Sequence, residues 1–262
     1  MDEAAGFGIF PARGPSRGWV HLAELSGQTA FITGASHGLG LAIARELARA
    51  GAAVACVARP GAELDQAVGE LEKVGRAFAA PADVTAASDI ERAVASTVAR
   101  LGRLDIVVIN AGTWKGALLH ETSEEMWDSL MALNLKGAFL TLKSALPHLI
   151  RAGRGTIVGI ASLGAWVGQP GQAAYAASKW GLRGLFESAA LEVKPHRIRV
   201  SLVSPHNINS AGLAIAPGSE ERDRKLEPAD IASLVAWICA APDHVSVGNV
   251  TIWPLAAGIT GG

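Results

Sequence analysis

Residues 29–50 read Thr29-Ala-Phe-Ile-Thr-Gly-Ala-Ser-His-Gly-Leu-Gly-Leu-Ala-Ile-Ala-Arg-Glu-Leu-Ala-Arg-Ala50. The short apolar run from Ala30 to Thr33 predicts a buried strand, and the helical period from Leu39 to Ala50 predicts a helix. Glycines between them let the backbone pass close to a pyrophosphate, whose negative charge is attracted by the free N–H groups at the helix start. The stretch therefore predicts a dinucleotide-binding turn. Its GxxxGxG spacing differs from GxGxxG, so an ordinary glycine-rich turn is the alternative.

The same alternation of strand and helix continues along the chain. Strands that are apolar on both faces and alternate with helices are typical of a parallel sheet covered by helices on each side. With right-handed crossovers, this predicts an α/β fold: one doubly wound parallel sheet of about seven strands, a Rossmann fold. We expect strands at 30–33, 53–58, 77–80, 105–110, 156–160, 198–203 and 250–253, and helices at 39–50, 62–74, 88–101, 124–150, 173–194 and 228–241.

The length and composition of the chain limit the number of domains and the kinds of binding partner that we expect. The chain has 262 residues, half of them apolar, which suits one α/β domain. We place this domain at 27–262, after an N-terminal extension at 1–26 that is rich in Gly, Pro and Arg. The net charge is −1 and no basic block occurs, which argues against a nucleic-acid or anionic-membrane partner and favours a small molecule.

Cysteine usage and the first residues bear on metal sites and location. Cys56 and Cys239 lie in apolar segments without CxxC or Cys/His spacing, so we expect two core residues, no disulfide framework and no metal site. The start lacks a basic n-region, and no stretch approaches the roughly 18 apolar residues of a membrane helix. These features predict a soluble cytoplasmic protein.

Arg59 follows the second predicted strand and bears on the choice of cofactor. In a dinucleotide fold this strand tip faces the adenosine ribose, where an acid would bond the 2′-hydroxyl and an arginine would accommodate a 2′-phosphate. No acid stands at the tip, so Arg59 favours NADP(H); a solvated arginine at a strand end is the alternative. His37 in the glycine turn either contacts a phosphate or is simply exposed.

Tyr175 and Lys179 stand at i and i+4 in a stretch compatible with a helix, and Ser162 lies thirteen positions upstream of Tyr175. One helical turn places the phenol and the ammonium on the same face. A nearby cation stabilises phenolate and would lower the pKa of the phenol from about 10. The pair therefore predicts a proton donor and acceptor for a carbonyl/alcohol couple, although the same spacing occurs on many solvated helices.

From about Leu25 to Pro254 the chain resembles the short-chain dehydrogenase/reductase family, because the motifs of that family occur here in family order. They are Thr33-Gly34 through Gly40, Asp83-Val84, Asn110-Ala111-Gly112, Asn134, Ser162, and Tyr175 with Lys179.

The resemblance implies an NADP(H)-dependent oxidoreductase that interconverts a ketone or aldehyde and an alcohol. It implies that Tyr175 is the general acid/base, that Ser162 bonds the carbonyl oxygen, that Lys179 holds the nicotinamide ribose, and that Asn134 anchors a water. Asp83 as a simple turn-former and Asn134 as a residue satisfying a backbone carbonyl are the alternatives. The implied cofactor residues are Gly34, Ser36, His37, Gly38, Leu39, Gly40, Arg59, Asp83, Val84, Asn110, Ala111, Gly112, Tyr175, Lys179, Pro205, Ile208 and Ser210.

The chain departs from the family pattern after the sixth predicted strand. His206 stands where the family has glycine, so it either contacts substrate, marks altered activity or is tolerated as an exposed side chain. The segments 226–232, 242–245 and 250–254 look like the tails of NADP-dependent 3-hydroxy acid dehydrogenases and related carbonyl reductases. No arginine stands out as a carboxylate clamp, which counts against a 3-hydroxy acid substrate.

Loops at the carboxyl ends of the strands predict the substrate pocket, and residues 211–226 predict a mobile lid. We expect two tryptophans of these loops to favour an apolar or aromatic ligand, unless they only pack a helix. Wide apolar faces on 124–150 and 173–194, which form the assembly interface in the resembled family, predict a homotetramer, with a dimer as the fallback. A cofactor-binding regulatory or scaffold protein without turnover is the competing interpretation. The pocket candidates are Trp114, Trp166, His206, Asn207 and Leu213.

Overall fold

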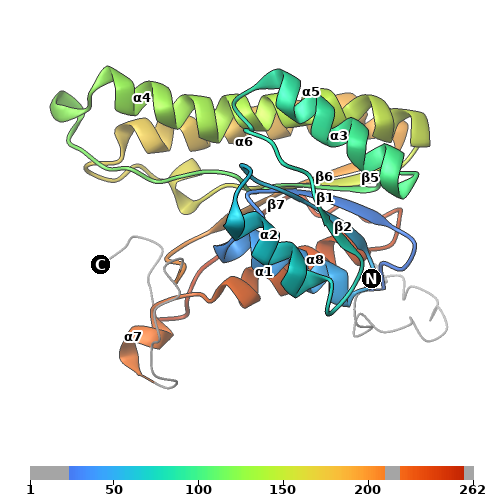
Figure 1. Ribbon diagram of the computed structural model, residues 1–262. Helices are drawn as coiled ribbons and strands as arrows, with labels where there is room; N and C mark the ends of the chain where they lie inside the picture. The colour runs from blue at the N-terminus through green and yellow to red at the C-terminus, as the bar shows by residue number, and fades with distance from the viewer. Residues whose placement is uncertain (1–23, 210–218, 257–262) are drawn as a thin grey trace, which may run out of the picture.

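The structure is a computed structural model and describes residues 24–209 and 219–256. Within these ranges, seven strands form one parallel sheet in the order β3-β2-β1-β4-β5-β6-β7 (Figure 1). The chain order reverses between β1 and β4, which is the switch point where doubly wound sheets bind ligands. The strands are β1 Thr29–Thr33, β2 Ala53–Val57, β3 Ala77–Ala79, β4 Ile106–Ile109, β5 Gly155–Ile160, β6 Ile198–Pro205 and β7 Asn249–Ile252.

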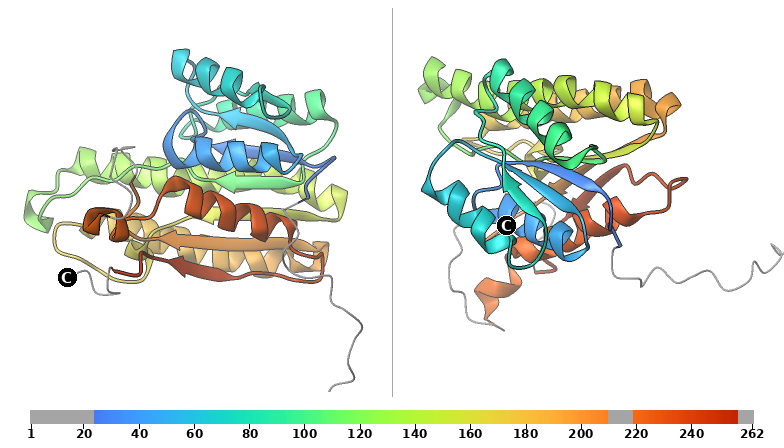
Figure 2. Two further views of the ribbon diagram at one scale, coloured as in Figure 1. Left: turned by 90° about the horizontal axis from the view of Figure 1, so that it is seen from below. Right: turned by 45° about the vertical axis from the view of Figure 1, so that its right-hand side comes forward.

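Helices cover both faces of the sheet. On one face α8 lies along α1, and α2 lies beside them, as Figures 1 and 2 show. On the other face lie α3, α4, α5 and α6. The helices are α1 Gly38–Arg49, α2 Ala62–Leu71, α3 Ala87–Leu101, α4 Glu124–Leu130, α5 Gly137–Ala152, α6 Ala173–Val193, α7 Glu220–Asp223 and α8 Pro228–Ala240, with short segments η1 Leu119–Glu121, η2 Met131–Lys136, η3 Leu163–Ala165 and η4 Lys194–His196.

The apolar runs explain why these segments become central strands. All five residues of β1 and all four of β4 are buried, because helices cover both faces of a parallel sheet. Side chains of alternate strand residues then enter two hydrophobic cores: Ile32 packs with α1 and α8, whereas Phe31 packs with the helices of the opposite face. The predicted fold class is confirmed.

Two boundaries differ from the expected ones. Leu25 is fully buried in the core, and its N–H donates to the carbonyl of Ala50 at 2.7 Å, so the packed domain includes residues assigned above to the extension. The predicted helix at 124–150 is interrupted by a π-helical segment, η2. Such segments carry one residue too many for the α-helical repeat and occur often at functional sites.

The described residues contain no helix that is both long and apolar enough to span a membrane. The first half of the lid predicted at 211–226, residues 211–218, lies outside the described part. Its described end forms the short helix α7.

Candidate active site

The turn between β1 and α1 is packed too closely to accept side chains. Gly34 has a φ of +68°, and a Cβ at Gly40 would lie 2.0 Å from the carbonyl oxygen of Gly34. The side-chain amide of Asn110, which follows β4, donates to the carbonyl oxygens of Thr33 and Gly34 at 3.1 and 3.2 Å. Asn110 therefore holds the turn in shape, and it is not among the residues that line the cavity beside it.

Thr33 contributes to the same clamp, and sequence reasoning missed this role. Its hydroxyl oxygen accepts hydrogen bonds from the N–H groups of Asn110 and Ala111, at 3.0 and 3.1 Å. These bonds tie the carboxyl ends of β1 and β4 together at the switch point. The sequence feature that could have indicated this role is a polar residue at the end of an otherwise apolar strand.

The amino end of α1 opens the turn to an anion. His37 precedes the helix, is exposed, and does not cap it through its side chain. N–H groups of a first helical turn have no partner within the helix, and they carry partial positive charge. An uncapped end beside a glycine turn fits a pyrophosphate.

A cavity of 660 Å³ lies beside this turn, at the carboxyl ends of the strands. Eight of the predicted cofactor residues line it together, although they come from four separate loops. Gly38, Leu39 and Gly40 form the adjacent first turn of α1. The lining includes Gly34, Ser36, His37, Arg59, Asp83, Val84, Ala111 and Gly112, with Glu63 and Leu133 among the residues not predicted.

Two acidic side chains line this cavity with Arg59. Asp83 accepts hydrogen bonds from the N–H and the hydroxyl of Thr85, at 2.8 and 2.7 Å, through one carboxylate oxygen. It thus shapes the turn after β3, which was one of the alternatives, and its other oxygen is not used in these bonds. Glu63 lies in the first turn of α2. Sequence reasoning missed Glu63 because it considered only the residue directly after β2 and not the helix that follows.

Ser162, Tyr175 and Lys179 meet beside the cavity. Ser162 follows β5 and accepts a hydrogen bond from Gly164 N–H at 3.1 Å, while Tyr175 and Lys179 lie on the first turns of α6. The ammonium of Lys179 donates to the carbonyl of Ile160 at 3.1 Å. A Cβ on Gly112, which lines the cavity, would lie 3.6 Å from Lys179 Nζ. Lys179 therefore approaches the cavity wall at Gly112, with Tyr175 one turn earlier on α6 and Ser162 beside Tyr175.

Burial raises the pKa of Tyr175, and a hydrogen bond with Ser162 lowers it by less. The prediction that Lys179 makes the phenol acidic is therefore wrong for the protein without a bound nucleotide. The physical reason is that burial of the phenol outweighs its hydrogen bond with Ser162, while Lys179 Nζ lies 5.8 Å from the ring centre and donates to the Ile160 carbonyl. A phenol with a raised pKa is protonated near neutral pH, which is the form that donates a proton.

Lys179 gives stability a pH dependence that can be measured. Desolvation lowers the pKa of this buried ammonium from 10.5 to about 8. Between these values the unfolded chain holds a proton that the folded chain has released, so the free energy of unfolding rises with pH. It is lowest below pH 8, where the folded protein holds a buried charge.

We expect the free energy of unfolding of the wild type to increase relative to that of Lys179→Met between pH 8 and 10. Urea denaturation of both proteins at each pH measures it. Parallel curves for the two proteins would contradict the lowered pKa.

Asn134 is buried in η2 and clamps the loop after β4. Its side-chain oxygen accepts from Thr113 N–H at 2.8 Å, and its amide donates to Thr113 carbonyl oxygen at 3.0 Å. The amide also donates to the Ser178 hydroxyl at 3.0 Å, and Ser178 donates to the Tyr175 carbonyl at 2.7 Å. Asn134 thus satisfies backbone groups, as the alternative held, and links the cavity wall to the Tyr175 helix.

The end of β6 brings His206 to the same edge of the sheet. Its N–H donates to the carbonyl of Ile252 at 2.9 Å, and partial burial lowers the pKa of the imidazole. Asn207 has a φ of +52°, is exposed, and donates to the Arg224 carbonyl, so it fixes the loop end. Ile208 pairs with Leu226. Pro205 ends β6, and the predicted Ser210 and Leu213 lie outside the described residues.

The two candidate tryptophans differ in their surroundings. Trp114 is 60% exposed and lies on the loop that Asn134 holds. Trp166 packs against the core, donates its indole N–H to Ser204 at 3.1 Å, and has the Arg183 guanidinium 3.7 Å from its ring centre. Trp166 therefore follows the packing alternative, and Trp114 is the tryptophan available to a ligand.

Among the described residues, no three His, Cys, Asp or Glu side chains gather closely enough to hold a metal ion. Cys56 and Cys239 are buried and free, and burial raises the pKa of both thiols to about 12. The prediction that both are core residues is confirmed.

Known proteins resemble this chain along most of its length. The sequence model of the family described as short chain dehydrogenase matches residues 28–217. The 3-oxoacyl-[acyl-carrier-protein] reductase FabG of Staphylococcus aureus is 35% identical over 224 residues, which cover 81% of this chain and 91% of that protein.

Two of the similar solved structures are complexes with a nicotinamide nucleotide. A metagenomic short-chain oxidoreductase in complex with NADP superposes with a TM-score of 0.77 at 39% identity, covering 88% of this chain and 98% of its own. Carveol dehydrogenase from Mycobacterium avium in complex with NAD superposes with a TM-score of 0.78 at 28% identity, covering 88% of this chain and 97% of its own.

Proposed function

The chain belongs to the short-chain dehydrogenase family, and on this premise we propose that it is an NADP(H)-dependent oxidoreductase that interconverts a ketone or aldehyde and the corresponding alcohol. The observation that carries the proposal is that Tyr175 bonds Ser162, that Lys179 lies one turn further along α6, and that Lys179 Nζ approaches Gly112 at the wall of the 660 Å³ cavity. Glycines that no Cβ would fit and an uncapped helix start make this cavity suited to a dinucleotide.

The proton chemistry is assigned to Tyr175. NADPH, when bound, supplies the hydride. The phenol is kept protonated by burial and gives its proton to the carbonyl oxygen of the substrate during reduction. Ser162, which bonds the phenol, also donates to that oxygen as negative charge develops there. In oxidation Tyr175 takes the proton back.

Lys179 and Asn134 position the reacting groups. Lys179 is held in place by Ile160 and faces Gly112 at the wall of the cleft, where its amine can donate to a ribose hydroxyl. Asn134 fixes Thr113 on both its N–H and its carbonyl group. Both residues therefore order the surface against which the nucleotide and Tyr175 must be aligned.

The proposed preference for NADP(H) rests on Arg59, which is exposed on the cavity wall. A guanidinium there pairs with a 2′-phosphate. Glu63 lines the same end and would repel that phosphate, so the preference depends on Arg59. One similar structure binds NADP and another binds NAD. The choice of nucleotide must therefore be argued from the residues of this chain.

We expect Arg59→Ala to lower kcat/KM for NADPH by about tenfold, the value of one charge-assisted contact, and to leave kcat/KM for NADH nearly unchanged. Glu63→Gln is the matched variant, and it should improve NADPH use because it removes a carboxylate. Steady-state kinetics with both nucleotides measure the effect. A wild-type protein that prefers NADH would refute the assignment.

The competing proposal is a regulatory or scaffold protein that binds NADP(H) without turnover, and His206 is the feature that favours it. The two are separated by NADPH oxidation across a panel of ketones and aldehydes. Turnover of any carbonyl supports the enzyme. Tight binding of NADPH with no oxidation across the panel supports the scaffold.

We also propose a homotetramer, with the faces of α4, α5 and α6 as one interface. Large apolar side chains stand exposed there on the described chain, which is costly for a monomer. Analytical ultracentrifugation measures the state, and a monomer at micromolar concentration would exclude it. The exposed residues are Trp127, Phe139, Ile150, Trp180 and Leu191.

A further inference from the structure

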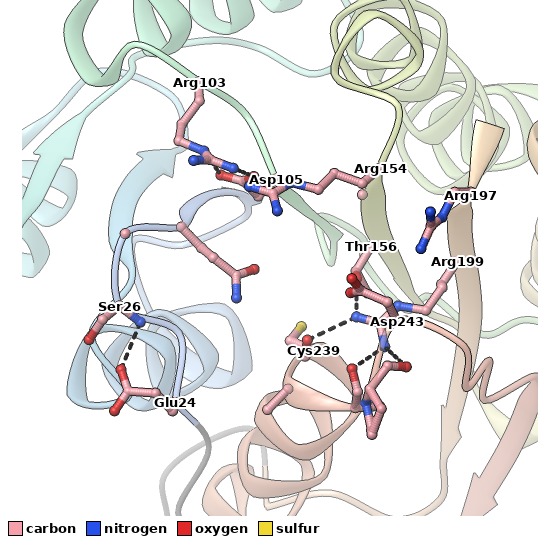
Figure 3. A pocket seen from close by; sticks show the side chains of 16 residues that line it. Glu24, Ser26, Arg103, Asp105, Arg154, Thr156, Arg197, Arg199, Cys239 and Asp243 are labelled. Carbon is pink, nitrogen blue, oxygen red and sulfur yellow. Dashed lines mark hydrogen bonds and ion pairs between the residues drawn. The ribbon is translucent and has the colours of Figure 1, made fainter.

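A second cavity, of 460 Å³, opens at the amino ends of the strands. The proposed active site uses the carboxyl ends, so the two cavities lie at opposite edges of the sheet. Four arginines from three separate connections line the second cavity, as Figure 3 shows. They are Arg103 before β4, Arg154 before β5, and Arg197 and Arg199 at the start of β6. The proposed proton chemistry does not use any of these arginines.

One carboxylate accounts for the first arginine. Asp105 is buried and forms a bidentate pair with Arg103, with contacts of 2.7 and 2.5 Å. The same carboxylate accepts the N–H of Thr29 at 2.9 Å. Arg154 reaches it only at 3.9 Å, and its side chain is 57% exposed. Asp105 is thus largely satisfied by Arg103 and Thr29, and Arg154 keeps most of its hydrogen-bonding capacity.

Arg199 adds a cation that no carboxylate bonds. Its terminal nitrogens donate to the Thr156 hydroxyl at 2.7 Å and to backbone carbonyls, among them those of Ala241 and Cys239 at 2.6 and 3.0 Å. These acceptors fix the guanidinium but carry no net charge. The positive charge of Arg199 is therefore not neutralised by these bonds, and it makes the cavity more attractive to an anion.

Arg197 is the residue best placed to bind a ligand. It is exposed, and no hydrogen bond or ion pair of its side chain occurs with the described residues. Its backbone has a φ of +57° and donates to the Lys194 carbonyl at 3.1 Å, which fixes where the side chain starts. In Figure 3 it points toward Thr156 and Arg199.

Two further acids face this cavity. Glu24 accepts the N–H of Ser26 at 3.0 Å and stands at the opposite rim from Arg197 (Figure 3). Asp243 is exposed and lies near Arg199, whose pKa its charge raises while burial lowers it. Asp243 therefore weakens the attraction of the cavity for an anion without abolishing it.

We propose that this cavity is a second ligand site, which binds a small oxyanion carrying two or more negative charges. Arg154 and Arg197 supply the direct contacts, because guanidinium groups match carboxylate and phosphate oxygens. Arg199 adds positive charge to the cavity, whereas the charge of Arg103 is neutralised by Asp105. The described lining contains no aromatic ring on which a base could stack, so the ligand is a compact polycarboxylate or phosphate compound and not a nucleotide. The proposal does not depend on the oxidoreductase activity.

The test is isothermal titration of the full-length protein with pyrophosphate and, separately, with citrate, at constant ionic strength. We expect saturable binding of at least one anion, with the stronger one identifying the phosphate or the carboxylate as the natural group. Arg197→Ala and Arg154→Ala should each weaken it by about tenfold. Asp243→Asn should strengthen it.

Two matched controls separate this site from others. Arg151→Ala removes an exposed arginine three residues from Arg154 that does not line the cavity, and it should leave binding unchanged. A titration repeated with saturating NADPH blocks the nucleotide cleft, whose glycine turn also fits a pyrophosphate, and it should leave binding at the second cavity unchanged. Thermal unfolding of each variant shows that it is folded. Absence of saturable binding by both anions, equal loss in Arg151→Ala, or loss of binding when NADPH is present would overturn the proposal.

Discussion

Replacing Tyr175 by phenylalanine should lower kcat/KM for carbonyl reduction by about a thousandfold, within the range by which positioned proton donors accelerate reactions. The substitution removes one oxygen atom from a half-buried ring and leaves the helix α6 intact. The affinity for NADPH should change little, because the cleft is lined by other residues. Stopped-flow or steady-state rates and a fluorescence titration of NADPH measure the two quantities separately.

Ser162→Ala is the companion variant for this experiment. It removes the hydroxyl that bonds Tyr175 and should cost less than Tyr175→Phe. The double variant should lose less activity than the two single losses combined, because the effects of groups that act as one unit are not additive. A Tyr175→Phe protein that retains a tenth of the wild-type rate would show that another group moves the proton.

Replacing Gly40 by alanine should cost about 1–3 kcal/mol of folding stability, as overpacking does, and should weaken NADPH binding by at least about tenfold. The added Cβ would lie 2.0 Å from the Gly34 carbonyl oxygen and 2.6 Å from Asn110 Nδ2. The first of these is a backbone atom, so the phosphate-binding turn itself must shift. Urea denaturation and NADPH titration measure the two effects.

Gly69→Ala is the matched control for this substitution. Gly69 lies within α2 and is exposed, and a Cβ added there would meet no atom within 4 Å. Alanine there should stabilise the protein by about 0.5–1 kcal/mol and leave the affinity for NADPH unchanged. Normal nucleotide binding by Gly40→Ala would mean that the turn does not carry the cofactor.

Local patterns were sufficient to predict the elements. Runs of a few neighbouring residues predict the fully buried strands β1 and β4 and the glycine turn before α1. The period of such runs does not depend on distant contacts. The order of motifs gave the resemblance to the short-chain dehydrogenase/reductase family, and that resemblance implied the roles of Asn134, Ser162, Tyr175 and Lys179. This much required no coordinates.

Burial set the pKa shifts of Tyr175 and Lys179, which their spacing in the sequence could not predict. The spacing of Tyr175 and Lys179 predicted an acidic phenol, yet packing removed both groups from water, and desolvation raises the pKa of Tyr175 while it lowers that of Lys179. The loss of solvent depends on segments far apart in the chain, which no short window of sequence contains.

The amino-acid sequence by itself determined the doubly wound sheet, the glycine turn before α1 and the identity of the proposed proton donor, because each follows from periodicity or from residues close together along the chain. Only the tertiary structure showed that Asn134 clamps Thr113 through a π-helical segment, that Glu63 shares a wall with Arg59, and that Arg154 and Arg197 face one cavity. Those arrangements join residues from separate connections, and their distances are set by how the helices pack on the sheet.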